Sequence, residues 1–75
     1  MATPLSMPAK RAIRCKRTGH WLTPDARWTS DFREALLFNN IADVVFTADR
    51  HTLTDVELVL RFDSNTPWDI SVDIY

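Results

Sequence analysis

Residues 55–62 (Asp-Val-Glu-Leu-Val-Leu-Arg-Phe) and 68–75 (Trp-Asp-Ile-Ser-Val-Asp-Ile-Tyr) decide the fold. In both stretches apolar and polar side chains alternate, and in the first stretch Val59 is the one apolar residue at a polar position. A period of two places the apolar side chains on one face of a strand. Residues 63–67 have the composition of a loop. The two stretches therefore predict an antiparallel hairpin with one face toward the core and one face in water.

Upstream of this hairpin, residues 31–52 carry two helical signals. Asp31 and Glu34 stand at the spacing of a capping box and predict a short helix or turn over residues 32–38. Asn40 is expected to cap a second helix, with Asp43 in its first turn. The apolar face of this second helix is predicted to hold Ile41, Val44, Val45, Ala48 and Thr52.

The front of the chain predicts short strands. Over residues 11–17, Ile13 and Cys15 alternate with basic side chains, which indicates a half-buried strand with a cationic outer face. The turn residues 23–26 (Thr-Pro-Asp-Ala) separate strand-like pieces at 20–22 and 27–29 and predict another hairpin. The expected whole is a two-layer α+β fold, in which a small antiparallel sheet of two hairpins is covered by one or two short helices.

Length and composition set the remaining limits. A chain of 75 residues supports one domain, expected over residues 10–75 after a flexible N-terminal tail at residues 1–9. The single cysteine, Cys15, excludes an internal disulfide. No apolar stretch approaches the roughly 20 residues that span a bilayer, and the first residues lack the pattern of a secretory signal. A cytoplasmic protein with no membrane partner is the expectation.

Residues 21–38 (Trp-Leu-Thr-Pro-Asp-Ala-Arg-Trp-Thr-Ser-Asp-Phe-Arg-Glu-Ala-Leu-Leu-Phe) carry a resemblance. They resemble a loose group of short uncharacterised bacterial and phage proteins, in which an aromatic strand, a turn and Trp-Thr precede a helix rich in alanine and phenylalanine. The resemblance covers roughly residues 19–50. The group has no known activity, so the resemblance implies a layout and no function.

Catalytic and metal-binding chemistry find little support in the sequence. One glycine cannot build a glycine-rich phosphate loop. Cys15, His20 and His51 lie at spacings that match no zinc pattern. Cys15 also occupies the apolar phase of its strand, where a thiol is usually a small core residue. We therefore expect no catalytic residue, no metal and no cofactor, and we do not expect an enzyme.

The charges are divided unevenly along the chain. Residues 1–33 carry a net charge of +5, and residues 34–75 carry −6. Two interpretations remain open: a basic segment at 10–17 that contacts an anionic partner, or basic residues that pair with the acidic half within the chain or across a dimer. The candidate binding residues are Lys10, Arg11, Arg14, Lys16, Arg17 and Trp28.

Trp28 and the last strand are the two further candidates for a binding surface. Trp28 comes directly after a turn and is expected to be partly exposed. The last strand, ending at Tyr75, is expected at an open sheet edge, which is a template for pairing with a second copy. Asp69 and Asp73 on its polar face are of the kind that discourages such pairing. The leading hypothesis is a non-enzymatic protein-interaction module, as a homodimer or with another protein. The alternative is a nucleic-acid-binding accessory protein that uses residues 10–17.

Overall fold

The structure, a computed structural model, describes residues 9–62 and 69–74. This part of the chain forms five strands, one α-helix and one short 3-10 helix. In chain order the elements are β1 (Ala9–Cys15), β2 (Trp21–Leu22), β3 (Trp28–Thr29), η1 (Phe32–Glu34), α1 (Ile41–Arg50), β4 (Val56–Phe62) and β5 (Asp69–Asp73).

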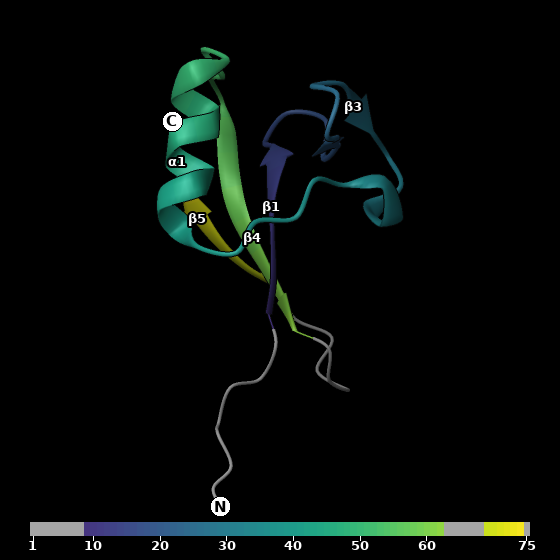
Figure 1. Ribbon diagram of the computed structural model, residues 1–75. Helices are drawn as coiled ribbons and strands as arrows, with labels where there is room; N and C mark the ends of the chain where they lie inside the picture. The colour runs from purple at the N-terminus through teal and green to yellow at the C-terminus, as the bar shows by residue number, and fades with distance from the viewer. Residues whose placement is uncertain (1–8, 63–68, 75) are drawn as a thin grey trace, which may run out of the picture.

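All five strands join in one antiparallel sheet, in the order β3-β2-β1-β4-β5 (Figure 1). Both predicted hairpins are present, as β2–β3 and β4–β5. The strand between them is β1, which pairs with β4 over its whole length, from Ala9 opposite Phe62 to Cys15 opposite Val56. The predicted α+β class is confirmed, with the two hairpins merged into a single sheet.

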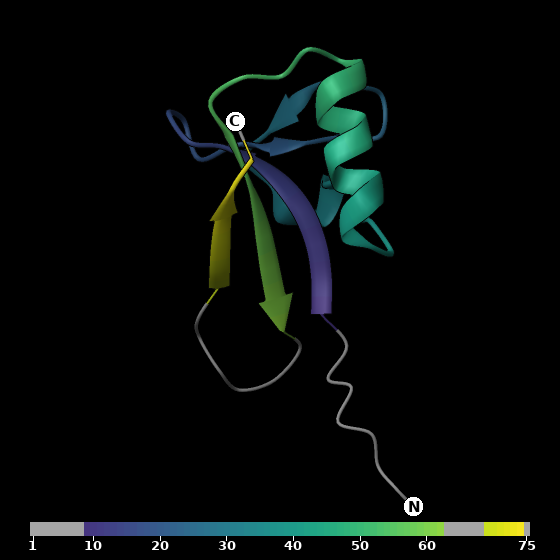
Figure 2. The same ribbon diagram turned by 90° about the vertical axis from the view of Figure 1, so that its left-hand side faces the viewer.

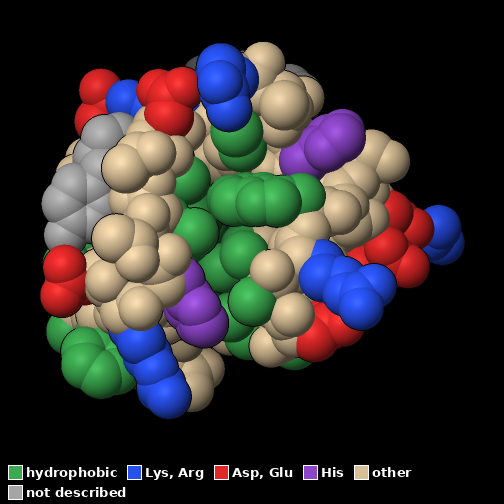
Figure 3. Space-filling view, turned by 90° about the horizontal axis from the view of Figure 1, so that it is seen from above, with side chains coloured by type: hydrophobic (Ala, Val, Ile, Leu, Met, Phe, Trp, Pro, Cys, Tyr) green, Lys and Arg blue, Asp and Glu red, His purple; other side chains and the backbone are tan. Residues whose placement is uncertain are grey.

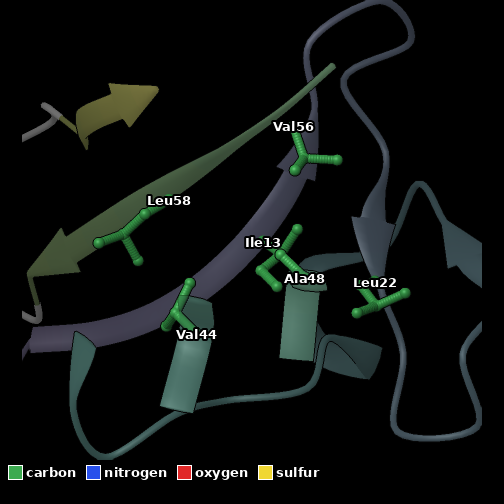
Figure 4. Packing of buried hydrophobic residues seen from close by; sticks show 6 residues of the cluster. All are labelled: Ile13, Leu22, Val44, Ala48, Val56 and Leu58. Atoms are coloured by element: carbon green, nitrogen blue, oxygen red, sulfur yellow. The ribbon is translucent and has the colours of Figure 1, made fainter. Parts of the chain in front are cut away.

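One face of the sheet is covered by α1, whose start the sequence predicted. The side-chain oxygen of Asn40 accepts a hydrogen bond from the backbone N–H of Asp43 at 2.9 Å, as an N-cap does. Val44 and Ala48 of α1 then pack onto Ile13 of β1 (Figure 4). This core is completed by Leu22, Val56 and Leu58. In Figure 2 α1 lies beside β1, while β5 lies farther from α1, on the other side of β4.

Of the residues predicted on the apolar face of the second helix, only Val44 and Ala48 are buried. Val44 and Ala48 are fully buried, but Ile41 is 55 % exposed and Val45 is 42 % exposed. Thr52 lies beyond the end of α1, with φ 55°. At 100° per residue, Val44 and Ala48 define a narrow stripe, and a ten-residue helix placed beside β1 buries that stripe and little more.

The second face of the sheet is covered over β1, β2 and the centre of β4, where the expectation of a face in water was wrong, whereas Ser71 and Asp73 of β5 on this face are exposed. Val59 is fully buried there with Ala12 and Trp21. Phe32 and Ala35 pack against these three residues. The segment that contains η1 thus forms a partial third layer. Val59, the apolar residue at a polar position of β4, is buried beneath this layer.

Over residues 32–38, where the sequence predicts a short helix or turn, the structure has the turn. Only one turn of 3-10 helix forms, and Ala35 already has an extended backbone. The backbone N–H of Leu36 donates to the carbonyl of Leu22 at 2.8 Å, and that of Phe38 donates to the carbonyl of Arg11 at 2.9 Å. Seven residues give fewer than two helical turns, so the sheet's open carbonyl groups compete successfully for these donors.

The predicted cap at Asp31 is present, but the capping box is not complete. Asp31 accepts from the backbone N–H of Arg33 at 2.9 Å. Glu34 instead accepts from the hydroxyl of Thr29 at 2.6 Å.

Several predictions fall outside the described residues. These are the flexible tail, except for Ala9, which begins β1; the 63–67 loop; and the positions of Trp68 and Tyr75.

Candidate interaction surface

Arg14, at the centre of the basic segment, is held inside the fold. Its Nε donates to Oε2 of Glu57 at 2.7 Å, and its Nη2 lies 3.3 Å from Oγ of Ser71. The guanidinium also lies 5.3 Å from the ring centre of Trp21. The side chain of Glu57 is 14 % exposed, so this pair is largely removed from water. Arg14 is therefore a structural residue of the sheet's second face.

Two further cations of the basic segment lie near acids of the C-terminal half. Lys16 Nζ is 3.6 Å from Asp73 Oδ1, and Arg17 Nε is 3.7 Å from Asp55 Oδ2. The side chains of Arg17 and Asp73 are 79 % and 78 % exposed. Surface pairs of this kind contribute little stability, but they neutralise charge locally. The pairing within the chain, one of the two interpretations left open by the sequence, is thus what the geometry presents.

The remaining two cations of the segment differ from each other. Lys10 is exposed at the start of β1. Arg11 is half-buried, and its Nε atom is buried with no hydrogen-bond partner among the described residues. These two side chains point to opposite faces of β1, because successive strand residues alternate. The five cations therefore do not form one continuous basic patch. Figure 3 agrees for the end of the molecule seen there: most basic side chains adjoin acidic ones around a hydrophobic centre.

A second arginine, Arg61, lies outside the basic segment and belongs to the same face as Arg14. Nε and Nη2 of Arg61 donate to the two carboxylate oxygens of Asp69, at 3.0 and 2.9 Å. Its guanidinium lies over Phe32, 4.1 Å from the ring centre, and 5.2 Å from that of Trp21. Hydrogen bonding from Arg61 lowers the pKa of Asp69 below its ordinary value. Opposite charges directly facing across two strands are the signal that could have revealed this pair.

Trp28 is partly exposed, as predicted, at 41 %. It lines an open pocket of about 380 Å³ at the β2–β3 hairpin. The pocket's other lining residues are Thr23, Pro24, Asp25, Arg27, Thr29 and Glu34. Inside this hairpin the hydroxyl of Thr23 donates to Oδ1 of Asp25 at 2.8 Å and accepts from the backbone N–H of Arg27 at 3.0 Å. These polar groups of the pocket are therefore hydrogen-bonded to one another. Trp28 stands apart from the basic segment along the sheet, because β2 lies between β3 and β1.

The most open part of the sheet is β5. Ile70 and Val72 are 49 % and 50 % exposed. They stand opposite Leu60 and Leu58 in the β4–β5 ladder and therefore share the face that α1 covers. α1 lies beside β1 and not over β5 (Figure 2), which accounts for the exposure of these two side chains.

The backbone of β5 is open as well. Ile74 donates its N–H to the carbonyl of Val56 at 3.2 Å. In an antiparallel ladder, hydrogen-bonded positions alternate, so residues 70 and 72 also bond toward β4. The N–H and C=O groups of Asp69, Ser71 and Asp73 then point away from the sheet. No strand among residues 9–62 and 69–74 pairs with that side of β5.

We call the side chains of Ile70 and Val72, together with the outward backbone groups of Asp69, Ser71 and Asp73, the β5 surface. Further exposed apolar side chains lie on α1 and on the segment before it. These are Leu37, Ile41, Val45 and Phe46.

The described residues assemble little that could do chemistry. Hydrogen bonding with Thr18 lowers the pKa of the Cys15 thiol. No group of three or more His, Cys, Asp or Glu side chains in the described ranges is arranged to hold a metal ion. No helix in this part of the chain has the length and apolar character needed to cross a membrane.

Comparisons of this chain with protein families, with curated proteins and with solved structures found no match.

Proposed function

We propose that the chain is a non-enzymatic protein-interaction module that binds its partner through the β5 surface. The observation that carries this proposal is an edge strand with open backbone groups and two half-exposed branched side chains, Ile70 and Val72. Natural proteins usually protect such an edge, because its unpaired N–H and C=O groups are a template for another strand.

The chemistry of the β5 surface suits recognition of an extended chain. In strand addition, main-chain hydrogen bonds supply affinity, and alternate side chains supply specificity. Here the outward backbone groups of Asp69, Ser71 and Asp73 would supply the first contribution. Ile70 and Val72 would supply the second, since burying a half-exposed aliphatic side chain contributes about 1 kcal/mol.

Charge pairing at the basic segment weighs against the nucleic-acid alternative. A phosphate would have to compete with Glu57 for Arg14, with Asp73 for Lys16 and with Asp55 for Arg17. The net charge of −1 also opposes approach of a polyanion. The protein-interaction hypothesis requires no pair to break.

A photo-crosslinking amino acid, p-benzoylphenylalanine, tests the proposal when it replaces Ile70. The matched control places it at Leu37, which is 48 % exposed against 49 % for Ile70 and lies beyond β1 on the other side of the sheet. In the cells that make this protein, position 70 should give discrete adducts that position 37 lacks. Adducts at neither position, or the same adducts at both, would remove support for the β5 surface.

A further inference from the structure

We infer that the occupant of the β5 surface is β5 of a second copy, paired antiparallel about a two-fold axis with Val72 opposite Val72 of the second copy. This inference rests on the proposed function and names its partner. A two-fold axis perpendicular to the sheet makes two identical edge strands antiparallel, which matches the pairing throughout this sheet. The result would be one continuous ten-stranded sheet, five strands from each copy.

The backbone limits the registers that two copies can adopt. Outward N–H and C=O groups belong to residues 69, 71 and 73, so these positions must face one another across the axis. Three symmetric registers pair at least two of these positions of each copy within β5. They pair residue 71 with 71, residue 69 with 71, or residue 71 with 73.

Side chains select among the three registers. Pairing 71 with 71 sets Asp69 directly opposite Asp73, and like charges in that position are destabilising. Pairing 69 with 71 sets Ser71 opposite Asp69, whose two carboxylate oxygens already accept from Arg61. The first register therefore gives Asp73 a neighbour of like charge. The second gives Ser71 a neighbour whose carboxylate is already hydrogen-bonded.

Pairing 71 with 73 gives each polar group a suitable neighbour. Asp73 is 78 % exposed, and its nearest cation, on Lys16, is 3.6 Å away, so its carboxylate can accept further hydrogen bonds. Oγ of Ser71 accepts from Nη2 of Arg14, which leaves the hydroxyl hydrogen to donate to Asp73 of the second copy. A hydrogen bond to a charged acceptor is the stronger kind.

The apolar face matches in the same register. Val72 meets its own copy across the axis, and Ile70 faces Ile74 of the second copy. Ile70 and Val72 are the half-exposed residues of β5, and Ile74 is partly buried against the core. Aspartate on an edge strand ordinarily opposes self-pairing. In β5 that effect is reduced, because Arg61 and Lys16 partly offset the two charges and the inferred register sets Ser71, not an aspartate, opposite Asp73.

The expected dimer is weak. Residues 70–74 of each copy would form the contact, which is small beside the roughly 1,200–2,000 Å² that stable complexes bury. We therefore expect a dissociation constant on the order of 100 μM, measured as a concentration-dependent mass.

Single cysteines measure the register directly. Positions 72 and 72 form a non-hydrogen-bonded pair in the inferred register, with about 4.5 Å between Cα atoms, which a disulfide can bridge. Val72→Cys is compared with Ile70→Cys, which has the same exposure, and with Ser71→Cys, all in a Cys15→Ser background. In a glutathione redox buffer, Val72→Cys should form the covalent dimer at least tenfold faster than either of the others.

Each outcome decides the inference. Faster coupling of Ile70→Cys or Ser71→Cys indicates one of the rejected registers, and equal rates indicate random collision; either result overturns it. If none couples and the unmodified chain sediments as a monomer at 1 mM, there is no second-copy contact at β5. Photo-adducts from position 70 to a different protein would then leave the proposed function standing and the homodimer wrong.

Discussion

Asp69 of β5 accepts two hydrogen bonds from Arg61 of β4, at 3.0 and 2.9 Å, directly across the strand ladder. This bidentate pair fixes both side chains and places the Arg61 guanidinium over Phe32. It therefore ties the edge strand to the layer that covers the second face. It also takes up one of the two acidic groups that would otherwise keep a second strand away from β5.

Replacing Asp69 with Asn should lower the free energy of unfolding by about 1–2 kcal/mol at pH 7, because the pair is only partly exposed. Arg61 lowers the pKa of Asp69, so this contribution is present above the ordinary carboxyl pKa of about 3.9 and is lost as the pH falls through the folded-state pKa. Urea unfolding at several pH values measures it. The difference from wild type should shrink below about pH 4. Asp49→Asn, exposed on α1, is the control, and an equal loss there would contradict this account.

Arg14→Ala should destabilise the chain more than Arg17→Ala. The first change leaves Glu57, which is 14 % exposed, without its partner and costs about 2 kcal/mol. The second breaks a pair whose side chains are 79 % and 49 % exposed and should cost less than about 0.5 kcal/mol. Thermal unfolding of the two variants compares them directly. Similar melting temperatures would mean that the Arg14–Glu57 pair carries no structural role.

The internal pairing of Arg14, Lys16 and Arg17 also predicts the result of a nucleic-acid titration. Short DNA and RNA should produce no saturable change in tryptophan fluorescence, even at low salt, where charge attraction is strongest. The chain's three tryptophans are the reporters in this experiment, among them Trp28, which is 41 % exposed, and Trp21, which is in contact with Arg14. Saturable binding that weakens steeply as salt rises would instead support the alternative function.

Neighbouring valines on α1 should differ in their effect on stability. Val44→Ala removes a fully buried side chain from the core and should cost about 2 kcal/mol. Val45→Ala removes one that is 42 % exposed and should cost less than about 1 kcal/mol. Denaturant unfolding of the pair tests the placement of α1. Equal losses would indicate that the helix is rotated toward the face predicted from the sequence.

Local patterns explain how much of this fold the sequence predicts. The period-two alternation over residues 55–62 and 68–75 indicates β4 and β5, and Asn40 with Asp43 indicates the start of α1. These signals lie within a few residues, so no knowledge of the fold is needed to recognise them. The choice between a helix and a turn at 32–38 is different, because the partners of Leu36 and Phe38 are carbonyls of Leu22 and Arg11, on other strands.

The candidate site shows the same limit. Arg14 and its partner Glu57 are 43 residues apart in the chain, so the sequence could offer internal pairing only as one of two interpretations. The importance of Ile70 and Val72 depends on where α1 lies relative to the sheet. Periodicity indicates that these residues are apolar and share a face, but it does not show which part of that face is covered.

Amide hydrogen exchange, followed by NMR over a concentration series, tests most directly the central claim that β5 receives another strand. The N–H groups of Ile70 and Val72 bond to β4 and should be protected at every concentration. Those of Ser71 and Asp73 point outward and should gain protection as the concentration rises toward 1 mM. Fast exchange at Ser71 and Asp73 at all concentrations would contradict the pairing of β5 with a second copy.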